Sequence, residues 1–384
     1  MSVTAAQGFT AAGIHAGVKE GDALDLALVA SSSGPIAAAA VFTQSLTEAA
    51  PVTLSREHIA DGRAHAVVLN SGCANAGTGV RGAAAAHAMA VAVGKALSTD
   101  PTNVVVCSTG AIGPELPVSL PDGATALVAA LDTVNHTLAA EAILTTDTFT
   151  KEAVVKWEGW VIGGMAKGAG MIRPNMATML SVLTTDAVVS SDVLQSTLIA
   201  SVRRTFNCLN IDGCQSTNDA VILMASGASG IAPDLDVFEA ALATVCFSLA
   251  RQMAEDAEGA SRVVTLNVSG AANARDAHQL GMAVANSALV RCSFYGGDPN
   301  WGRVYGALGV AGVSLAANEV SIAYNGMTVA HGGGEAPFDR DSLLADLAEG
   351  EIIVDIVVGH GPGSASIVTT DLTPEYVTFN GEPS

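Results

Sequence analysis

The sequence predicts a mixed α/β fold with a large N-terminal domain and a smaller C-terminal α/β domain. Segments with the character of buried strands alternate with helical segments along the whole chain. The chain has 384 residues, of which 49% are apolar and only 14% charged, so it can bury a large core. No internal repeat or long linker interrupts it. We place one domain at 1–230 and the other at 231–384, with the boundary within Ala225–Asp234.

Composition excludes several classes of partner. The net charge of −20 repels phosphate backbones and anionic membrane surfaces, which argues against nucleic-acid and membrane binding. The first twenty residues lack the apolar centre of a signal peptide, and the longest apolar run, Ala83–Leu97, is interrupted by His87 and Lys95. Neither the six cysteines nor the eight histidines have metal-ligand spacing. We therefore expect a cytoplasmic enzyme with reduced thiols and no metal.

The first half of the chain contains a notable strand-to-turn junction. Strands are predicted at Ala38–Phe42 and Ala66–Leu69, and a loop of small polar residues, Asn70–Gly79, follows the second. A helix then leads to the strand Val104–Cys107, which runs into Ser108-Thr-Gly-Ala-Ile-Gly113. Backbone N–H groups of such a turn can converge on a phosphate or on a developing oxyanion. A plain tight turn is the commoner role, and no GxxxxGK[ST] motif is present.

The remaining elements continue the alternation. A hairpin is predicted around Glu158-Gly159, and an amphipathic helix capped by Asp234 ends near Glu258-Gly259. The last third combines strands with one long helix and a hairpin turn, at Val264–Val268, Ala274–Leu289, Asn325-Gly326, Ile352–Val358 and Ser366–Thr370. These elements predict the smaller α/β domain.

The segment Lys167-Gly-Ala-Gly-Met-Ile-Arg-Pro-Asn-Met-Ala-Thr-Met-Leu180 permits two interpretations. Thr178 follows the small Ala177 and opens an apolar run, as a β-branched residue at the start of a buried strand does. Alternatively, the chain cleaves itself between these two residues, and the freed threonine uses its own α-amine as a base. An α-amine has a reference pKa of about 8, which suits a general base near neutral pH. Local spacing does not decide between them.

Motifs along almost the whole chain resemble those of one family. Lys167-Gly-Ala-Gly-Met171 with Met176-Ala-Thr-Met-Leu180 resembles the self-cleavage motif of the ArgJ family, the ornithine acetyltransferases. Further family motifs follow in the same order: Ala39–Thr43 with Ala50-Pro51, Ser108-Thr-Gly110, Thr145-Thr-Asp-Thr148, Ser216-Thr-Asn-Asp219, Asp256-Ala-Glu-Gly259 and Asp298-Pro-Asn-Trp-Gly-Arg303. The resemblance implies a layered αββα-type sandwich, as in DmpA and ArgJ proteins, with a smaller C-terminal α/β domain.

The resemblance also implies an activity. Cleavage at Ala177–Thr178 would give an α chain of 1–177 and a β chain of 178–384, assembled as an α2β2 heterotetramer. Thr178 would then take acetyl from N2-acetylornithine and pass it to glutamate by a ping-pong route in arginine biosynthesis. No cofactor is implied, except acetyl-CoA if the enzyme is bifunctional.

Further site residues are implied by position. The Thr109 hydroxyl and the Gly110 N–H would form the oxyanion hole. Substrate contacts would come, besides Thr178, from Thr145, Lys167, Glu258, Asn380 and Ser384. Lys167 suits an α-carboxylate and Glu258 a cationic amine. In isolation, each of these two charges would be interpreted as solvated surface.

Some positions depart from the family pattern. Cysteine occupies position 73 and glycine position 77 in the first polar loop, Cys214-Gln215 precede Ser-Thr-Asn-Asp, and Arg173 stands near the scissile bond. The C-terminal Asn380-Gly-Glu-Pro-Ser384 is about one residue shorter than usual. The exact acyl donor and acceptor stay open. The alternatives are a specialised paralogue, a bifunctional enzyme that also uses acetyl-CoA, an N-terminal-nucleophile amidohydrolase and a non-catalytic binding protein.

Overall fold

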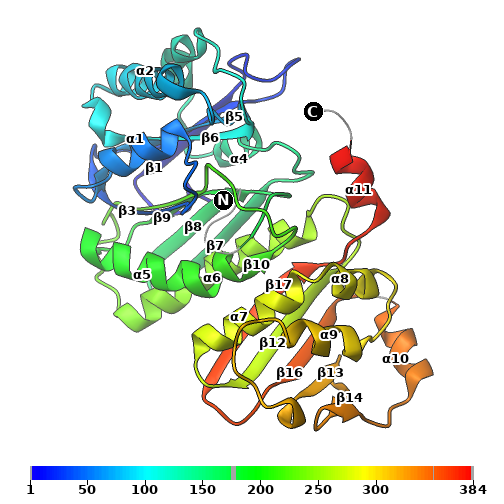
Figure 1. The fold of residues 1–384 in the computed structure, drawn as a ribbon. Helices are drawn as coiled ribbons and strands as arrows, with labels where there is room; N and C mark the ends of the chain where they lie inside the picture. The colour runs from blue at the N-terminus through cyan, green and yellow to red at the C-terminus, as the bar shows by residue number, and fades with distance from the viewer. Residues whose placement is uncertain (1, 174–178, 349, 382–384) are drawn as a thin grey trace. The chain divides into compact units, whose positions relative to one another are not determined.

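The structure is a computed structural model of the chain and describes residues 2–173, 179–348 and 350–381 (Figure 1). It consists of two compact units. The first comprises Met1–Phe206 with Cys214–Met253, and the second comprises Asn207–Gly213 with Ala254–Ser384. The division predicted at 230/231 differs from this one, because the long helix that follows it packs on a sheet of the first unit.

Two sheets form the centre of the first unit. One has the order β1-β2-β5-β6, from Phe9–Ile14, Leu26–Ser31, Ala66–Cys73 and Val104–Ala111. The other has the order β4-β3-β11-β9-β8-β7, from Arg63–Ala64, Ile36–Phe42, Ala220–Ala225, Leu180–Thr185, Trp160–Lys167 and Lys151–Trp157. The pairs β5/β6 and β9/β11 are parallel, and the other pairs are antiparallel.

Side chains that point alternately to the two faces of each strand explain how these sheets stack. On β5, Val67 and Leu69 point into a core shared with the second sheet, including Val182 and Ile222. Their neighbours Ala66 and Val68 point the other way, against helices on the outer face. Each fully buried Val or Leu contributes about 1.5–3 kcal/mol relative to an exposed one.

Helices cover both outer faces. Helices α2 (Gly79–Leu97) and α3 (Ala124–Ala129) pack on the four-stranded sheet, while α5 (Ser191–Arg204) and α6 (Leu235–Glu255) cover the six-stranded one (Figure 1). Smaller elements complete the unit: α1 (Ala50–His58), α4 (His136–Ala142), and the 3₁₀ turns Pro101–Asn103 and Leu120–Gly123. The αββα sandwich expected from the family resemblance is therefore confirmed.

Helix α6 begins where the sequence predicts. The Asp234 carboxylate accepts hydrogen bonds from the N–H groups of Asp236 at 3.0 Å and Val237 at 3.1 Å, which is an N-cap. Among the described residues, this helix alone is long and apolar enough to cross a membrane, and half of the window that meets the test is buried inside the protein. Val245 and Leu249 of α6 lie against Gly164 of β8, as in the core helix of a globular unit.

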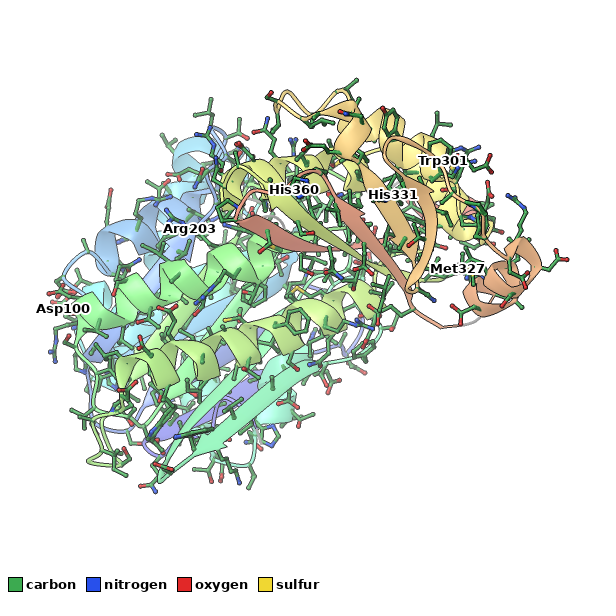
Figure 2. The ribbon with its side chains drawn as sticks, turned by 90° about the horizontal axis from the view of Figure 1, so that it is seen from below. Asp100, Arg203, Trp301, Met327, His331 and His360 are labelled. Carbon is green, nitrogen blue, oxygen red and sulfur yellow. The ribbon has the colours of Figure 1, made fainter. Side chains whose placement is uncertain are left out.

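The second unit is built on a seven-stranded sheet of order β10-β17-β12-β16-β13-β14-β15, from Leu209–Asn210, Gly363–Thr370, Val263–Ala271, Ile352–Val357, Ser321–Tyr324, Met327–His331 and Gly334–Glu335. Its helices are α7 (Ala274–Ala285), α8 (Ala288–Tyr295), α9 (Trp301–Leu308), α10 (Arg340–Leu347) and α11 (Pro374–Gly381), with 3₁₀ turns at Phe206–Cys208 and Ala317–Glu319. Figure 2 labels Met327 and His331 at the two ends of β14.

Two local features of this unit bear on the sequence predictions. The Asn325-Gly326 turn is confirmed, because both residues have positive φ, 46° and 82°, between β13 and β14. The single helix predicted for Ala274–Leu289 is instead two helices. The Ser287 side chain accepts from the N–H of Val290 and starts α8, so a new helix begins where the first one ends.

Candidate active site

Two parallel strands of the first unit bring the predicted oxyanion residues together with the first polar loop. β5 and β6 run side by side, so that Ser71 lies opposite Thr109 and Gly72 opposite Gly110. Carboxyl ends of neighbouring parallel strands are a common place for binding sites. Gly110 has a φ of 131°, and a Cβ there would lie 2.3 Å from the Gly72 carbonyl carbon. Only glycine fits at this position.

Lys167 connects two other residues that the sequence predicts for the site. It ends β8, and its side chain is only 2% exposed. Its ammonium donates a hydrogen bond to the Thr145 hydroxyl at 2.7 Å and to the buried Thr109 hydroxyl at 3.3 Å. The interpretation of Lys167 as a solvated surface charge is therefore wrong, because the folded chain places its ammonium among buried hydroxyl groups.

Asp147 is the counter-ion of this cluster, and sequence reasoning missed it. Its fully buried carboxylate lies 3.6 Å from the Lys167 ammonium and accepts from the Lys151 ammonium at 2.7 Å. It also accepts from the N–H groups of Gly168 at 2.6 Å and Thr145 at 3.1 Å. Burial alone would raise the pKa of Asp147, but the two lysines and these bonds outweigh it and lower the pKa to about 2. The available signal was an aspartate in Thr-Thr-Asp-Thr, four residues before a lysine.

A second lysine lies close to the same strand ends. The Lys19 ammonium donates to the Leu24 carbonyl at 2.9 Å, and its stem runs beside Gly72, where a Cβ would lie 3.0 Å from the Lys19 Cγ. Burial lowers the pKa of Lys19, Asp25 opposes that effect, and the positive charge of Lys167 adds to it. Lys19 is thus half-buried near a like charge, and nothing in the local sequence indicated this.

The Ser216-Thr-Asn-Asp219 motif, which directly precedes β11, holds the ends of β5 and β6 in place. The Asn218 amide donates to the Ala74 carbonyl at 2.6 Å and to the Ser108 carbonyl at 2.9 Å. The Ser108 hydroxyl in turn donates to Asn70 at 2.6 Å. This network of buried side chains holds both polar loops in one arrangement.

Two predicted residues of the second unit also contact each other. The Asn380 amide donates to the Glu258 carboxylate at 3.2 Å, and to the Tyr376 carbonyl at the same distance. Next to Glu258, Gly259 has a φ of 63°, and a Cβ there would lie 2.3 Å from the Tyr376 nitrogen. Helix α11 therefore requires glycine at that point.

Three predicted residues, Ala177, Thr178 and Ser384, lie outside the described residues.

Of the positions that depart from the family pattern, Cys73 is buried, and its thiol donates to the Pro114 carbonyl at 3.2 Å. Burial raises the pKa of this thiol, so it is protonated at neutral pH. Arg173 is exposed. Among the described residues, no group of three His, Cys, Asp or Glu side chains is placed to hold a metal ion.

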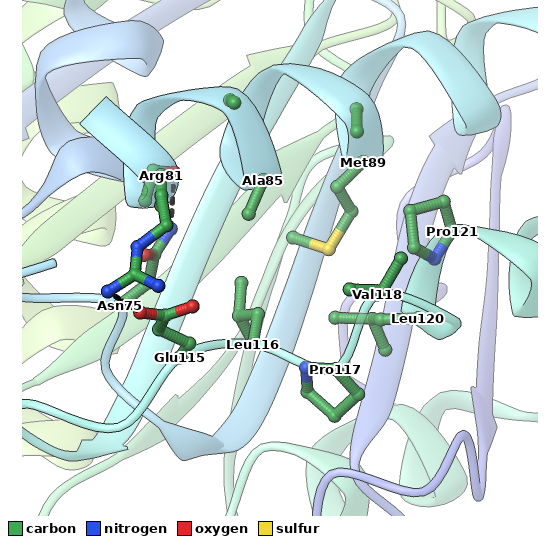
Figure 3. A pocket seen from close by; sticks show the side chains of 13 residues that line it. Asn75, Arg81, Ala85, Met89, Glu115, Leu116, Pro117, Val118, Leu120 and Pro121 are labelled. Carbon is green, nitrogen blue, oxygen red and sulfur yellow. Dashed lines mark hydrogen bonds and ion pairs between the residues drawn. The ribbon is translucent and has the colours of Figure 1, made fainter. Parts of the chain in front are cut away.

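A separate apolar cavity of about 320 Å³ lies between α2 and the segment that follows β6 (Figure 3). Met89, Leu116 and Leu120 form its walls, and the ion pair of Arg81 with Glu115 at 2.5 Å lies at its polar end. None of the predicted site residues that the structure describes lines it, so it is distinct from the Lys167 cluster.

Comparison with known proteins decides the family. The model of the ArgJ family matches residues 10–383. The chain belongs to the ArgJ family. The arginine biosynthesis bifunctional protein ArgJ of Thermobifida fusca is 46% identical over 381 residues, covering 99% of both chains, and that of Mycobacterium tuberculosis H37Rv is 44% identical over 393 residues, covering 98% of this chain and 95% of the relative. A solved chain of ArgJ from Bacillus halodurans is 33% identical, with a TM-score of 0.50 over 52% of this chain and 96% of that one.

Proposed function

We propose that this ArgJ-family protein is a glutamate N-acetyltransferase of arginine biosynthesis. It transfers acetyl from N2-acetyl-L-ornithine to L-glutamate through an acetyl-Thr178 intermediate, after self-cleavage at Ala177–Thr178. The observation that carries the proposal is the buried ammonium of Lys167, which joins the hydroxyls of Thr109 and Thr145 beside Gly110. The names of the curated relatives, which assign them to arginine biosynthesis, support the pathway.

Thr109 is suited to stabilise an oxyanion. Its oxygen accepts a hydrogen bond from the Lys167 ammonium, so its own hydrogen is left to donate. The neighbouring cation polarises the hydroxyl and makes it a stronger donor. Together with the Gly110 N–H it would bind the tetrahedral oxyanion, and each such donor is typically worth a factor of about 100–1000 in rate.

Lys167 is suited to the one group that both substrates share, the α-carboxylate. Acetylornithine and glutamate occupy the site in turn, so a fixed cation would align each for the same carbonyl chemistry. Asp147, whose carboxylate lies 3.6 Å from the ammonium, keeps that cation in place. Thr145, whose hydroxyl accepts from Lys167, would give a further polar contact.

Thr178 would supply both nucleophile and base. Its α-amine, with a reference pKa of about 8, takes the hydroxyl proton as the oxygen attacks the acetyl carbonyl. That proton then passes to the departing amine of ornithine, and the reverse sequence acetylates glutamate. Met179 and the buried strand β9 follow immediately, which would hold the nucleophile on a rigid element. Glu258 with Asn380 would contact the cationic amine of the ornithine side chain, and Ser384 stays a predicted contact.

Intact mass spectrometry tests the proposal. The purified chain should separate into fragments 1–177 and 178–384, and N2-acetylornithine should add one acetyl group to the larger fragment. Glutamate should then remove that group as N-acetylglutamate. A Thr178→Ala chain should stay whole. An uncut wild-type chain without acetyl transfer would point to a binding protein, and free acetate without acetylglutamate would point to an amidohydrolase.

A bifunctional enzyme is the second candidate, because both curated relatives carry that word in their names. Acetyl-CoA would then replace acetylornithine as donor to Thr178. An assay with acetyl-CoA and glutamate separates the two: N-acetylglutamate formed without acetylornithine indicates the bifunctional enzyme. The α2β2 assembly and the cytoplasmic location are further proposals, and light scattering of the cleaved protein tests the first.

A further inference from the structure

A second lysine lies beside the strand ends that carry the predicted oxyanion residues. The loop between β1 and β2 contains Lys19, whose aliphatic stem packs on Gly72, since a Cβ at Gly72 would lie 3.0 Å from the Lys19 Cγ. Gly72 in turn lies opposite Gly110 of β6, and a Cβ at Gly110 would lie 2.3 Å from the Gly72 carbonyl carbon. A single residue of β5 therefore separates Lys19 from Gly110.

The loop that carries Lys19 is held in one conformation by Asp25, which is 0% exposed. The carboxylate of Asp25 accepts hydrogen bonds from the N–H groups of Ala16 at 2.6 Å, Val18 at 2.7 Å and Lys19 at 3.0 Å. The Asp25 carbonyl accepts from the N–H of Ser71 at 2.9 Å, which ties the end of the loop to β5. Hydrogen bonds to a carboxylate are among the strong ones. The backbone of Lys19 is thus fixed independently of its side chain.

The ammonium of Lys19 has donors to spare and no anionic partner in the protein. It donates to the Leu24 carbonyl at 2.9 Å, and an ammonium has three donors. Among the described residues it forms no ion pair within 4.0 Å, and the Asp25 carboxylate is occupied by the N–H groups of the loop. Burial lowers the pKa of Lys19 more than Asp25 raises it, so the surroundings do not fully compensate its charge. A half-buried ammonium of this kind is suited to an anionic ligand.

Two cations close to one oxyanion site suit a substrate that has two carboxylates. The first cation is Lys167, whose ammonium donates to the Thr109 hydroxyl at 3.3 Å and for which we propose the α-carboxylate. Its positive charge acts on Lys19 as well. Of the two proposed substrates, glutamate alone carries a second carboxylate, whereas the side chain of acetylornithine ends in a cation. The positive charge of Lys19 is therefore complementary to glutamate and not to the acetyl donor.

Building on the proposed transferase, we propose that Lys19 binds the side-chain carboxylate of glutamate and thereby selects the acetyl acceptor. This carboxylate takes the remaining donors of the Lys19 ammonium while Lys167 holds the α-carboxylate. A bound carboxylate also favours the charged form of the lysine. The same ammonium repels the cationic side chain of ornithine, which favours the exchange of this first product for glutamate.

One change in the enzyme and one in the substrate isolate this contact. Lys19→Met removes the ammonium but keeps an aliphatic stem on Gly72 and the backbone N–H on Asp25. Glutamine replaces the side-chain carboxylate of glutamate by a neutral amide of nearly the same shape. Acetyl transfer from acetylornithine to either acceptor is followed by mass spectrometry of the acetylated product. In a ping-pong reaction, kcat/KM for the acceptor reports the second half-reaction alone, so any effect on the donor is measured separately.

We expect Lys19→Met to lower kcat/KM for glutamate about 10–100-fold, the usual worth of a hydrogen bond to a charged group. The value for glutamine should stay within about twofold of the wild type, and KM for acetylornithine should not rise. Lys19→Arg, which keeps the charge, should recover part of the preference for glutamate. Lys95→Met is the matched control, because Lys95 is an exposed lysine in the last turn of α2 and should leave both acceptors unaffected.

A purely structural role of Lys19 would give a different result. It would lower kcat/KM for glutamate, glutamine and acetylornithine alike, and that outcome overturns the proposal, as does an unchanged kcat/KM for glutamate. If Lys19→Met does not fold, Lys19→Gln takes its place in the same comparison, because its amide keeps a donor for the Leu24 carbonyl. A wild-type protein that makes no N-acetylglutamate from either acetyl donor overturns the proposed function itself.

Discussion

Replacing Asp147 with asparagine should destabilise the first unit by about 3–5 kcal/mol, the usual cost of breaking a buried ion pair from one side. The substitution removes the negative charge that lies 2.7 Å from the Lys151 ammonium and 3.6 Å from that of Lys167. The side-chain NH2 group of the new asparagine would also face at least one N–H donor, at a position where a carboxylate oxygen of Asp147 now accepts a hydrogen bond. Urea denaturation at neutral pH measures the loss.

The pH dependence gives an independent magnitude for the same interaction. The pKa of Asp147 falls from 3.8 to about 2 on folding, and at about 1.4 kcal/mol per pH unit this corresponds to about 2 kcal/mol. Because the folded pKa is the lower one, this stability is present above the unfolded value and is lost as the pH falls from about 4 to 2. Asp147→Asn should lack that part of the acid-induced loss.

The fluorescence of Trp157 and Trp160, both in the first unit, makes the measurement specific to that unit. Trp160 is buried in β8, with its ring centroid 5.6 Å from that of Phe238, whereas Trp301 belongs to the second unit and is replaced by phenylalanine in every variant. Glu239→Gln is the control, because its ion pair with Arg204 is largely exposed and should be worth less than about 1 kcal/mol. The reasoning is refuted if Asp147→Asn unfolds within 1 kcal/mol of the wild type and loses the same stability in acid.

Three further outcomes follow from the same geometry. Gly110→Ala should reduce acetyl transfer at least about 100-fold, because its Cβ would overlap Gly72; a normal kcat would contradict the oxyanion role. Lys167→Met should fold but raise KM for both acetylornithine and glutamate, and a change confined to one substrate would exclude a shared carboxylate site. Asn218→Ala should cost about 2–3 kcal/mol in thermal or urea unfolding, since two buried carbonyl oxygens lose their donor. A loss below 0.5 kcal/mol would show that the network is not rigid.

The sequence was most informative where a residue type dictates local geometry. Asp234 as a cap and Asn325-Gly326 as a turn followed from backbone chemistry, and the structure contains both. The strands β1 and β2 escaped notice, because β2 is buried on both faces and therefore shows no alternation, and both are rich in alanine. The break between α7 and α8 escaped for a related reason: apolar residues continue through it, and only the Ser287 cap shows where the new helix starts.

The charged cluster could not be predicted from composition or periodicity. Lys151 and Lys167 come together because β7 and β8 form a hairpin in which Lys151 lies opposite Ala166, next to Lys167. The Thr109 contact adds a strand from the other sheet. The pairing register of β7 and β8 and the packing of the two sheets of the first unit must both be known before these side chains can be placed. The resemblance of motifs could name Lys167 as a site residue, but it gave no indication that Asp147 supports it.

The burial of this cluster is itself an argument for function. Three charged side chains in an interior that is otherwise apolar must be desolvated, and well-packed apolar residues in their place would often be neutral or more stable. The hydrogen bonds of Asp147 to Gly168 and Thr145 offset that cost without requiring the ammonium of Lys167 to be there. What the ammonium adds is a fixed positive charge between two hydroxyl groups, at the end of the strand that leads toward the cleavage segment. Because Lys151 still pairs with Asp147 at 2.7 Å when Lys167 is removed, we expect Lys167→Met to retain the fold at some cost in stability and to raise KM for both substrates, as the proposed recognition of an anionic group requires.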